Sequence, residues 1–190
     1  MKNMSLLHDI LDFNDKFVEN KTFEQYETSG IPKRKMAILS CMDTRLLELL
    51  PKSMNLKNGD AKMIKNAGAI ITHPFDSVMR SLLVAIYELQ VGEVFIIAHH
   101  ECGMSGVNTE SMMEKMKQRG IDENVFTTLD FSGVDLHKWL KGFTDVKENV
   151  RNSVAMAKKH PLFPKDVPVH GLVIHPKTGK LDLVVNGYEK

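Results

Sequence analysis

Three short runs, the first and third of them mostly apolar, limit most strongly what this chain can fold into. They occupy residues 35–40 (KMAILS), 62–66 (KMIKN) and 93–98 (EVFIIA). Short runs without regular polar alternation are typical of strands that are buried on both faces of a parallel sheet. Between the second and third runs, residues 75–90 repeat apolar side chains at helical spacing. This alternation predicts an α/β fold in which helices cover both faces of the sheet.

The rest of the chain adds helices and a terminal hairpin to this fold. Further segments with helical spacing are 44–50, 110–119 and 143–159. Pro51 is expected to end the first of them. Two late strands, 169–174 and 181–185, are joined by a turn short enough for an antiparallel hairpin. We therefore expect a doubly wound, mostly parallel sheet of about four to five strands flanked by helices, with 121–142 unassigned.

Residues 1–30 are expected to form a helical arm within a single domain that spans 1–190. Residues 4–19 place apolar side chains on one helical face and Asp and Asn on the other. Such a face packs either on its own domain or on a partner subunit, and the sequence favours neither.

Composition excludes several kinds of protein. The 190 residues are 43% hydrophobic and 26% charged, with a formal net charge of +1 and no block of basic residues. This argues against a nucleic-acid binder, and no apolar run is long enough to span a membrane. The first residues lack the pattern of a secretory signal peptide, so we expect a cytoplasmic protein. In that compartment a disulfide between the two cysteines, Cys41 and Cys102, is not expected.

Three side chains that suit zinc follow the ends of two predicted strands. Cys41 ends the first strand, and His99 and Cys102 follow the third. In a doubly wound sheet, ligands collect beyond the carboxyl ends of the strands, where the strand order reverses. If these strands are neighbours there, two thiolates and an imidazole converge and leave a fourth zinc position open for water. A lone cysteine at a strand end is more often a buried hydrophobe, so the residues around the three must decide.

The segment after Cys41 favours a catalytic interpretation. Asp43 and Arg45 follow the thiol at intervals of two residues. The simpler interpretation is that Asp43 caps a helix and that Arg45 is a solvated charge. A carboxylate beside a metal-bound water would instead orient it by accepting its hydrogen bond, and the arginine would keep that carboxylate ionised.

The chain carries three short blocks in order, namely CMDTR at 41–45, KNAGA at 65–69 and HHECGM at 99–104. Taken together, these blocks resemble the β-class carbonic anhydrases, most of all the small bacterial and archaeal members. The resemblance implies Zn²⁺ on Cys41, His99 and Cys102, with a catalytic dyad of Asp43 and Arg45. It also implies a substrate pocket walled by Asn66, Ala67, Gly68 and Gly103. His100 is a rival ligand, although the H-x-x-C spacing favours His99.

The activity implied by this resemblance is a lyase reaction, the reversible hydration of carbon dioxide to bicarbonate and a proton. Zinc-bound hydroxide oriented by the Asp–Arg dyad would carry it out, in a homodimer or a dimer of dimers. Two alternatives stay open. A related zinc hydrolase acting on carbonyl sulfide or carbon disulfide would carry the same motifs, and so would a non-catalytic protein that binds zinc or bicarbonate. The dyad favours an enzyme, and a structural zinc would usually have four protein ligands.

Overall fold

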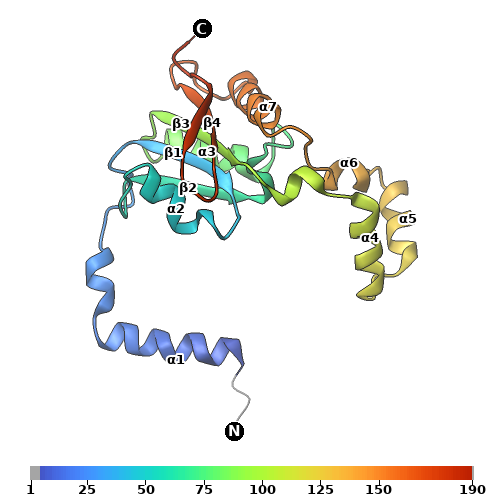
Figure 1. Cartoon of the computed structure of the whole chain (residues 1–190), viewed down its shortest axis with the longest axis horizontal. Coiled ribbons are helices and arrows are strands. Elements are labelled where there is room, and N and C mark those ends of the chain that lie inside the picture. Colours follow the sequence, from blue (N-terminus) through green and yellow to red (C-terminus); the bar gives the residue numbers. More distant parts are fainter. Residues whose placement is uncertain (1–4, 190) are drawn as a thin grey trace. The chain divides into compact units, whose positions relative to one another are not determined.

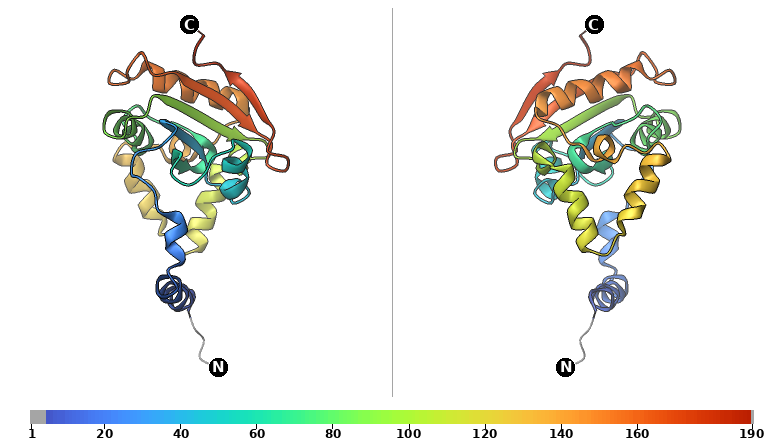
Figure 2. Two further views of the ribbon diagram at one scale, coloured as in Figure 1. Left: turned by 90° about the vertical axis from the view of Figure 1, so that its left-hand side faces the viewer. Right: turned by 90° about the vertical axis from the view of Figure 1, so that its right-hand side faces the viewer.

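A computed structural model describes residues 5–189 and divides the chain into two compact units, one up to Gly30 and one from Ile31 onward. The start of the helix predicted from residue 4, and both ends of the domain predicted for 1–190, lie outside the described residues. The larger unit holds a five-stranded sheet flanked by helices, which confirms the predicted α/β fold (Figures 1 and 2).

The sheet has the strand order β2-β1-β3-β4-β5, and its first four strands run parallel. The strands are β1 (Met36–Cys41), β2 (Ala61–Asn66), β3 (Glu93–His99), β4 (Val169–Ile174) and β5 (Leu181–Val185). β5 pairs antiparallel with β4, which confirms the predicted hairpin. The order reverses at β1, because the chain moves from β1 to β2 on one side and then to β3 on the other. The carboxyl ends of β1 and β3 therefore lie side by side at the switch point.

Side chains of the sheet alternate between two apolar clusters, one on each face. In β1, Ala37 and Leu39 enter one cluster, and Met36 and Ile38 enter the other. The covering helices are α3 (Ser77–Tyr87) and α7 (Val146–Lys159) on the first face and α2 (Leu46–Ser53) on the second. Because β1 is buried on both faces, its sequence shows no polar alternation. A fully buried leucine such as Leu39 stabilises the fold by about 1.5–3 kcal/mol.

Helix α2 does not end where the sequence predicts. It spans Leu46–Ser53 and includes Pro51, so the prediction that Pro51 ends the helix is wrong. A proline inside a helix removes one N–H that would bond four residues back, here to Leu47. Leu47 is 66% exposed, so water can reach this part of the helix. Leu50 is fully buried against the sheet, and this packing stabilises the helix on both sides of the proline.

The unassigned segment 121–142 contains two short helices. They are α5 (Glu123–Phe131) and α6 (Leu136–Leu140). Each follows an aspartate, Asp122 or Asp135, whose carboxylate accepts a backbone N–H of the first turn. The helices predicted at 110–119 and 143–159 are confirmed as α4 (Thr109–Gln118) and α7. Short 3-10 turns follow β2 and Cys102, namely η2 (Ala67–Ala69) and η3 (Gly103–Gly106).

The N-terminal unit is helical, as the sequence predicts. It consists of α1 (Leu6–Glu19) and the 3-10 turn η1 (Thr22–Tyr26), and the rings of Phe17 and Tyr26 stack with centroids 6.2 Å apart. Most of the apolar side chains of α1 are more than half exposed. Within residues 5–189, no helix combines the length and the apolar character that crossing a bilayer requires.

Candidate metal centre

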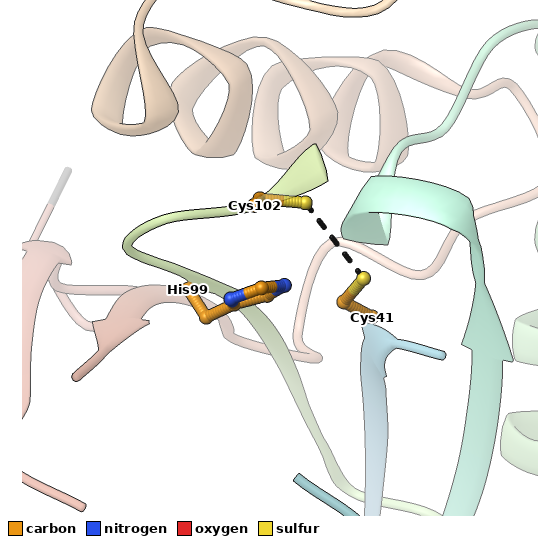
Figure 3. A group of neighbouring side chains, drawn as sticks. All are labelled: Cys41, His99 and Cys102. Carbon is orange, nitrogen blue, oxygen red and sulfur yellow. Dashed lines mark hydrogen bonds between the residues drawn. The ribbon is translucent and has the colours of Figure 1, made fainter. Parts of the chain in front are cut away.

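Two neighbouring strands bring the three predicted ligands together. Cys41 is the last residue of β1 and His99 the last of β3, and Cys102 follows His99 after one tight turn (Figure 3). Glu101 makes that turn with a φ of 56°, in the left-handed region. The two sulfurs and a ring nitrogen of His99 all lie within 4.8 Å of one another, and all three residues are buried. The fold therefore assembles the cluster that the sequence predicts.

The spacing of these atoms fits a tetrahedral zinc ion. Two sulfurs bound to zinc at about 2.3 Å with tetrahedral angles lie about 3.8 Å apart. The Sγ atoms of Cys41 and Cys102 are 3.8 Å apart and form no disulfide. Two thiols and one imidazole are donors that zinc accepts in catalytic sites, where a fourth position stays open.

The imidazole of His99 is oriented for metal binding. Its Nδ1 lies 2.8 Å from the carbonyl oxygen of His100. Because a carbonyl only accepts hydrogen bonds, Nδ1 must carry the proton, and neutral His99 presents a lone pair at Nε2. Nε2 is buried and has no hydrogen-bond partner among the residues that the structure describes. A buried nitrogen in this state is costly unless a ligand satisfies it, which suits a metal at this place.

His100 does not belong to the cluster. Its Nε2 lies 3.7 Å from Oδ2 of Asp182 on β5, and its side chain is 35% exposed. Its ring also lies near that of His175, with centroids 6.1 Å apart. The rival ligand is therefore turned toward the terminal hairpin, and the geometry favours His99 as the H-x-x-C spacing does.

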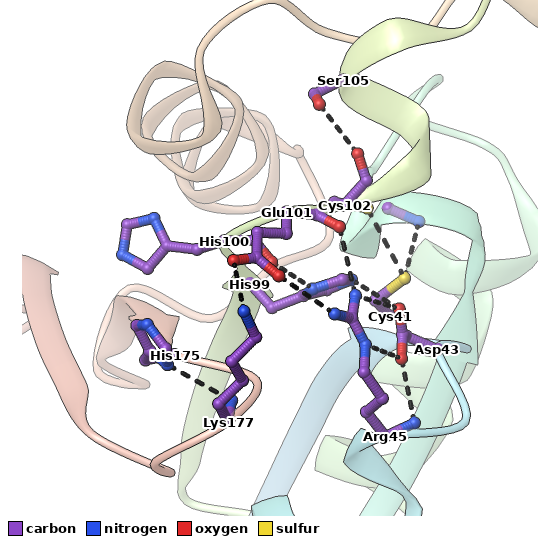
Figure 4. A network of polar contacts seen from close by, with 11 residues as sticks. Cys41, Asp43, Arg45, His99, His100, Glu101, Cys102, Ser105, His175 and Lys177 are labelled. Carbon is purple, nitrogen blue, oxygen red and sulfur yellow. Dashed lines mark hydrogen bonds and ion pairs between the residues drawn. The ribbon is translucent and has the colours of Figure 1, made fainter.

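Asp43 and Arg45 form a bidentate ion pair beside the cluster (Figure 4). Nε and Nη2 of Arg45 donate to the two carboxylate oxygens at 3.0 and 2.8 Å. These hydrogen bonds lower the pKa of Asp43 to about 2. Asp43 also accepts the backbone N–H of Arg45 at 2.9 Å, so it shapes the turn before α2 as a capping residue would. Its Oδ2 is 3.7 Å from Nε2 of His99, which places a fixed negative charge at the edge of the cluster.

Glu101 is a second partner of Arg45, which the sequence motifs do not reveal. Nη1 of Arg45 donates to Oε2 of Glu101 at 3.3 Å, and Nη2 donates to its carbonyl oxygen at 3.1 Å. Lys177, on the turn between β4 and β5, pairs with Oε1 at 3.4 Å and lowers the pKa of Glu101. Arg45 is thus held from two sides, by Asp43 and by Glu101. The only hint in the sequence is that Glu101 stands between two predicted ligands.

The end of β2 and the loop after it lie beside the candidate metal centre and hold three of the four residues predicted to wall a substrate pocket. Asn66 closes this loop, because its side chain bonds the N–H and the C=O of Ile70 at 3.2 and 2.6 Å. Gly68 donates its N–H to Sγ of Cys41 at 3.3 Å. It does so with a φ of 85°, a conformation that favours glycine. The other two residues predicted for the wall stand in η2 and at the start of η3: Ala67 and Gly103.

The two thiols differ in how readily they ionise. Burial raises the pKa of both. At Cys41 the adjacent ring of His99 and the hydrogen bond from the Gly68 backbone outweigh burial and lower the pKa to about 7. At Cys102 the proximity of Cys41 adds to burial, and the pKa rises to about 11. Cys41 is therefore the thiol that becomes available as an anionic ligand first as pH rises.

Comparison with known proteins agrees with this geometry. Residues 36–181 match the family described as carbonic anhydrase. The chain is 62% identical over 185 residues to YtiB of Bacillus subtilis (strain 168), a protein named provisionally as a carbonic anhydrase, over 97% of this chain and 99% of that one. It is 40% identical to β-carbonic anhydrase isoform I of Trichomonas vaginalis, with a TM-score of 0.88 over 97% and 100% of the two chains. It is also 32% identical over 172 residues to a carbon disulfide hydrolase of Acidithiobacillus thiooxidans, over 87% and 85% of the two chains.

The family match includes every candidate site residue, from Cys41 to Gly103. The likeness to the Trichomonas vaginalis enzyme extends over the whole sheet and its covering helices, since it covers 97% of this chain. The chain therefore belongs to the β-class carbonic anhydrases, a family of metal-dependent lyases.

Proposed function

We propose that this protein is a zinc-dependent carbonic anhydrase, which hydrates carbon dioxide reversibly to bicarbonate and a proton. The observation that carries the proposal is the buried cluster of Cys41, His99 and Cys102 beside a carboxylate that Arg45 fixes. Three protein donors are typical of a zinc site that binds water as well. A purely structural zinc would have no use for the fixed carboxylate of Asp43.

Cys41, His99 and Cys102 would hold the zinc ion, which supplies the Lewis acidity that makes water a nucleophile near neutral pH. His99 contributes a neutral imidazole whose tautomer is set by the carbonyl oxygen of His100. Gly68 donates an N–H to the Cys41 sulfur, which reduces the negative charge that this thiolate gives to the metal. The chain therefore fixes the tautomer of His99 and the charge on the Cys41 sulfur before the metal binds.

Asp43 orients the nucleophile. Because hydrogen bonds from Arg45 hold its pKa at about 2, its carboxylate is ionised throughout the neutral range. An ionised carboxylate only accepts hydrogen bonds, so it favours an oxygen that still carries a proton. Carbon dioxide has neither charge nor a hydrogen-bond donor, and we assign its place to small or neutral residues near the sulfurs. These are Asn66, Ala67, Gly68 and Gly103.

Metal analysis combined with stopped-flow hydration of carbon dioxide tests the proposal. The wild type is expected to hold one zinc per chain and to hydrate carbon dioxide. Cys41→Ser should lose both zinc and activity, because one of three donors is weakened. Asp43→Ala should keep its zinc and lose about 10²-fold in rate, as expected when a reacting group is misoriented. Asp182→Ala, which removes a carboxylate on β5 outside the dyad, is the matched control and should keep both.

Two results would contradict this assignment. A zinc-loaded wild type that hydrates carbon dioxide no faster than the buffer would contradict the proposed activity. Full activity in Asp43→Ala would remove the role of the dyad. The 32% identity to a carbon disulfide hydrolase makes carbon disulfide the second substrate to assay, and hydrolysis of it without carbon dioxide hydration would select that alternative.

We also propose that the protein works in the cytoplasm as a homodimer or dimer of dimers, with the apolar face of α1 buried against a second copy. In support, Leu7 and Leu11 are each more than half exposed within their own unit. Light scattering of the full chain should give the mass of a dimer or tetramer. Leu7→Asp combined with Leu11→Asp should lower that mass, whereas Lys16→Asp on the polar face should not. An unchanged mass in the double variant would contradict the role given to α1.

A further inference from the structure

Helix α7 carries two polar residues in the middle of its buried face. Asn149 and Ser153 are one helical turn apart and are 6% and 1% exposed, and they alternate with the buried Val150 and Val154. An amide or hydroxyl in such a place destabilises the fold unless it forms hydrogen bonds. Both side chains therefore need hydrogen-bond partners inside the fold.

Both side chains bind the loop that follows β2. Nδ2 of Asn149 donates to the carbonyl oxygen of Gly68 at 3.1 Å. Oγ of Ser153 accepts the N–H of Ile71 at 3.2 Å. The helix thus holds the loop at two points, three residues apart, and only the first point lies next to the candidate metal centre.

The contact of Asn149 continues to a candidate ligand. Gly68, whose carbonyl Asn149 holds, donates its own N–H to Sγ of Cys41 at 3.3 Å. Gly68 reaches this orientation with a φ of 85°. The backbone of glycine is more flexible than that of any other residue. A glycine free to rotate would not keep an N–H aimed at one sulfur, and the bond to its own carbonyl is the restraint that acts on Gly68 directly. The contact of Ser153 leads to Ile71 and does not reach the sulfur.

We propose that Asn149 is a positioning residue for the metal centre, which fixes the Gly68 N–H on the Cys41 sulfur and thereby sets the affinity and the electronic character of that ligand. This inference rests on the proposed zinc site. A hydrogen bond to a ligating sulfur withdraws electron density from it, and groups behind the ligands typically change metal affinity by about 10- to 100-fold. Asn149 acts through Gly68 and touches neither metal nor substrate.

Zinc affinity and the spectrum of the cobalt-substituted protein test this role. Asn149→Leu keeps the branching at Cγ and removes the donor, and Asn149→Ala is the second variant because leucine is larger than asparagine. Ser153→Ala is the matched control, because it removes one buried hydrogen bond from the same helix to the same loop. Zinc dissociation constants come from competition with a chelator. The sulfur-to-cobalt charge-transfer band reports on the thiolate directly.

Both Asn149 variants should raise the zinc dissociation constant about tenfold or more and shift the charge-transfer band. Ser153→Ala should change the constant less than about threefold and leave the band in place, with circular dichroism unchanged in all folded variants. Equal effects of the Asn149 and Ser153 variants would reduce Asn149 to a structural anchor of the loop, and an unshifted band in both Asn149 variants would overturn the inference. A wild type that binds no zinc would instead refute the proposed function.

Discussion

Gly68→Ala offers the sharpest test of how the loop beside the metal centre is built. The φ of 85° is unfavourable for alanine by about 1–2 kcal/mol. A Cβ added here would lie 2.9 Å from Cδ1 of Ile70, closer than real Cβ contacts come, and 3.1 Å from Cγ of Met104, which is a tight contact. Both neighbours are side chains that can shift, so the lower range of overpacking, about 1–2 kcal/mol, applies. The expected loss in the free energy of unfolding is about 2–4 kcal/mol.

Gly120→Ala separates the two contributions. Gly120 also has a positive φ, 96°, but no atom lies within 4 Å of the place that its Cβ would take. Its substitution should cost the backbone term alone, about 1–2 kcal/mol. Urea unfolding of the metal-free proteins at constant m-value measures the difference. An equal loss in the free energy of unfolding for Gly68→Ala and Gly120→Ala would show that the neighbours of Gly68 do not crowd an added Cβ.

Three further predictions concern the dyad and the metal. Glu101→Gln removes the partly exposed ion pairs of Glu101 with Arg45 and Lys177. It should lower the hydration rate only about 1.5- to 5-fold at unchanged zinc content. A complete loss of activity would contradict the supporting role given to Glu101. The pKa of Asp43 is lowered by folding, so its ionised form stabilises the protein above about pH 4, and this contribution is lost as pH falls toward about 2. Urea unfolding should therefore show Asp43→Asn less stable than the wild type by about 1–2 kcal/mol at pH 6, with a difference that shrinks toward pH 3. Zinc at about 1,000 times its dissociation constant should stabilise the apoprotein by about 4 kcal/mol and raise Tm by about 8–16 °C in a thermal scan. An equal rise of Tm in Cys41→Ser would show that zinc binds elsewhere.

The strands and the cluster could be predicted because local patterns encode them. A run buried on both faces, such as 36–41, has no polar alternation, and its last residue must lie at the carboxyl edge of the sheet. Cys41 and His99 each end such a run, so their convergence required only that β1 and β3 be neighbours. Helices α5 and α6 were missed because no long apolar stripe marks them, although an aspartate cap begins each.

The partners of the site residues could not be predicted, because they come from distant parts of the chain. Lys177 reaches Glu101 only because the hairpin of β4 and β5 folds back beside β3. Asn149 reaches Gly68 across 81 positions, and nothing in its own segment indicates a loop of that kind. The end of α2 was predicted wrongly for a similar reason. The packing of α2 on the sheet outweighs the helix-breaking tendency of Pro51.

The candidate ligands lie at the ends of two strands, β1 and β3, that are far apart in sequence. This separation affects when a metal can bind during folding. Cys41 and Cys102 are 61 positions apart, and they meet only after β1 and β3 have paired in parallel across α2, β2 and α3. Such non-local pairing is a slow event in folding, because a long loop must close before any contact forms. The complete set of three donors therefore forms only late in folding, unlike in small domains whose ligands are all close in sequence. If the proposed zinc site is right, we expect a cell short of zinc to accumulate folded, inactive apoprotein rather than unfolded chain.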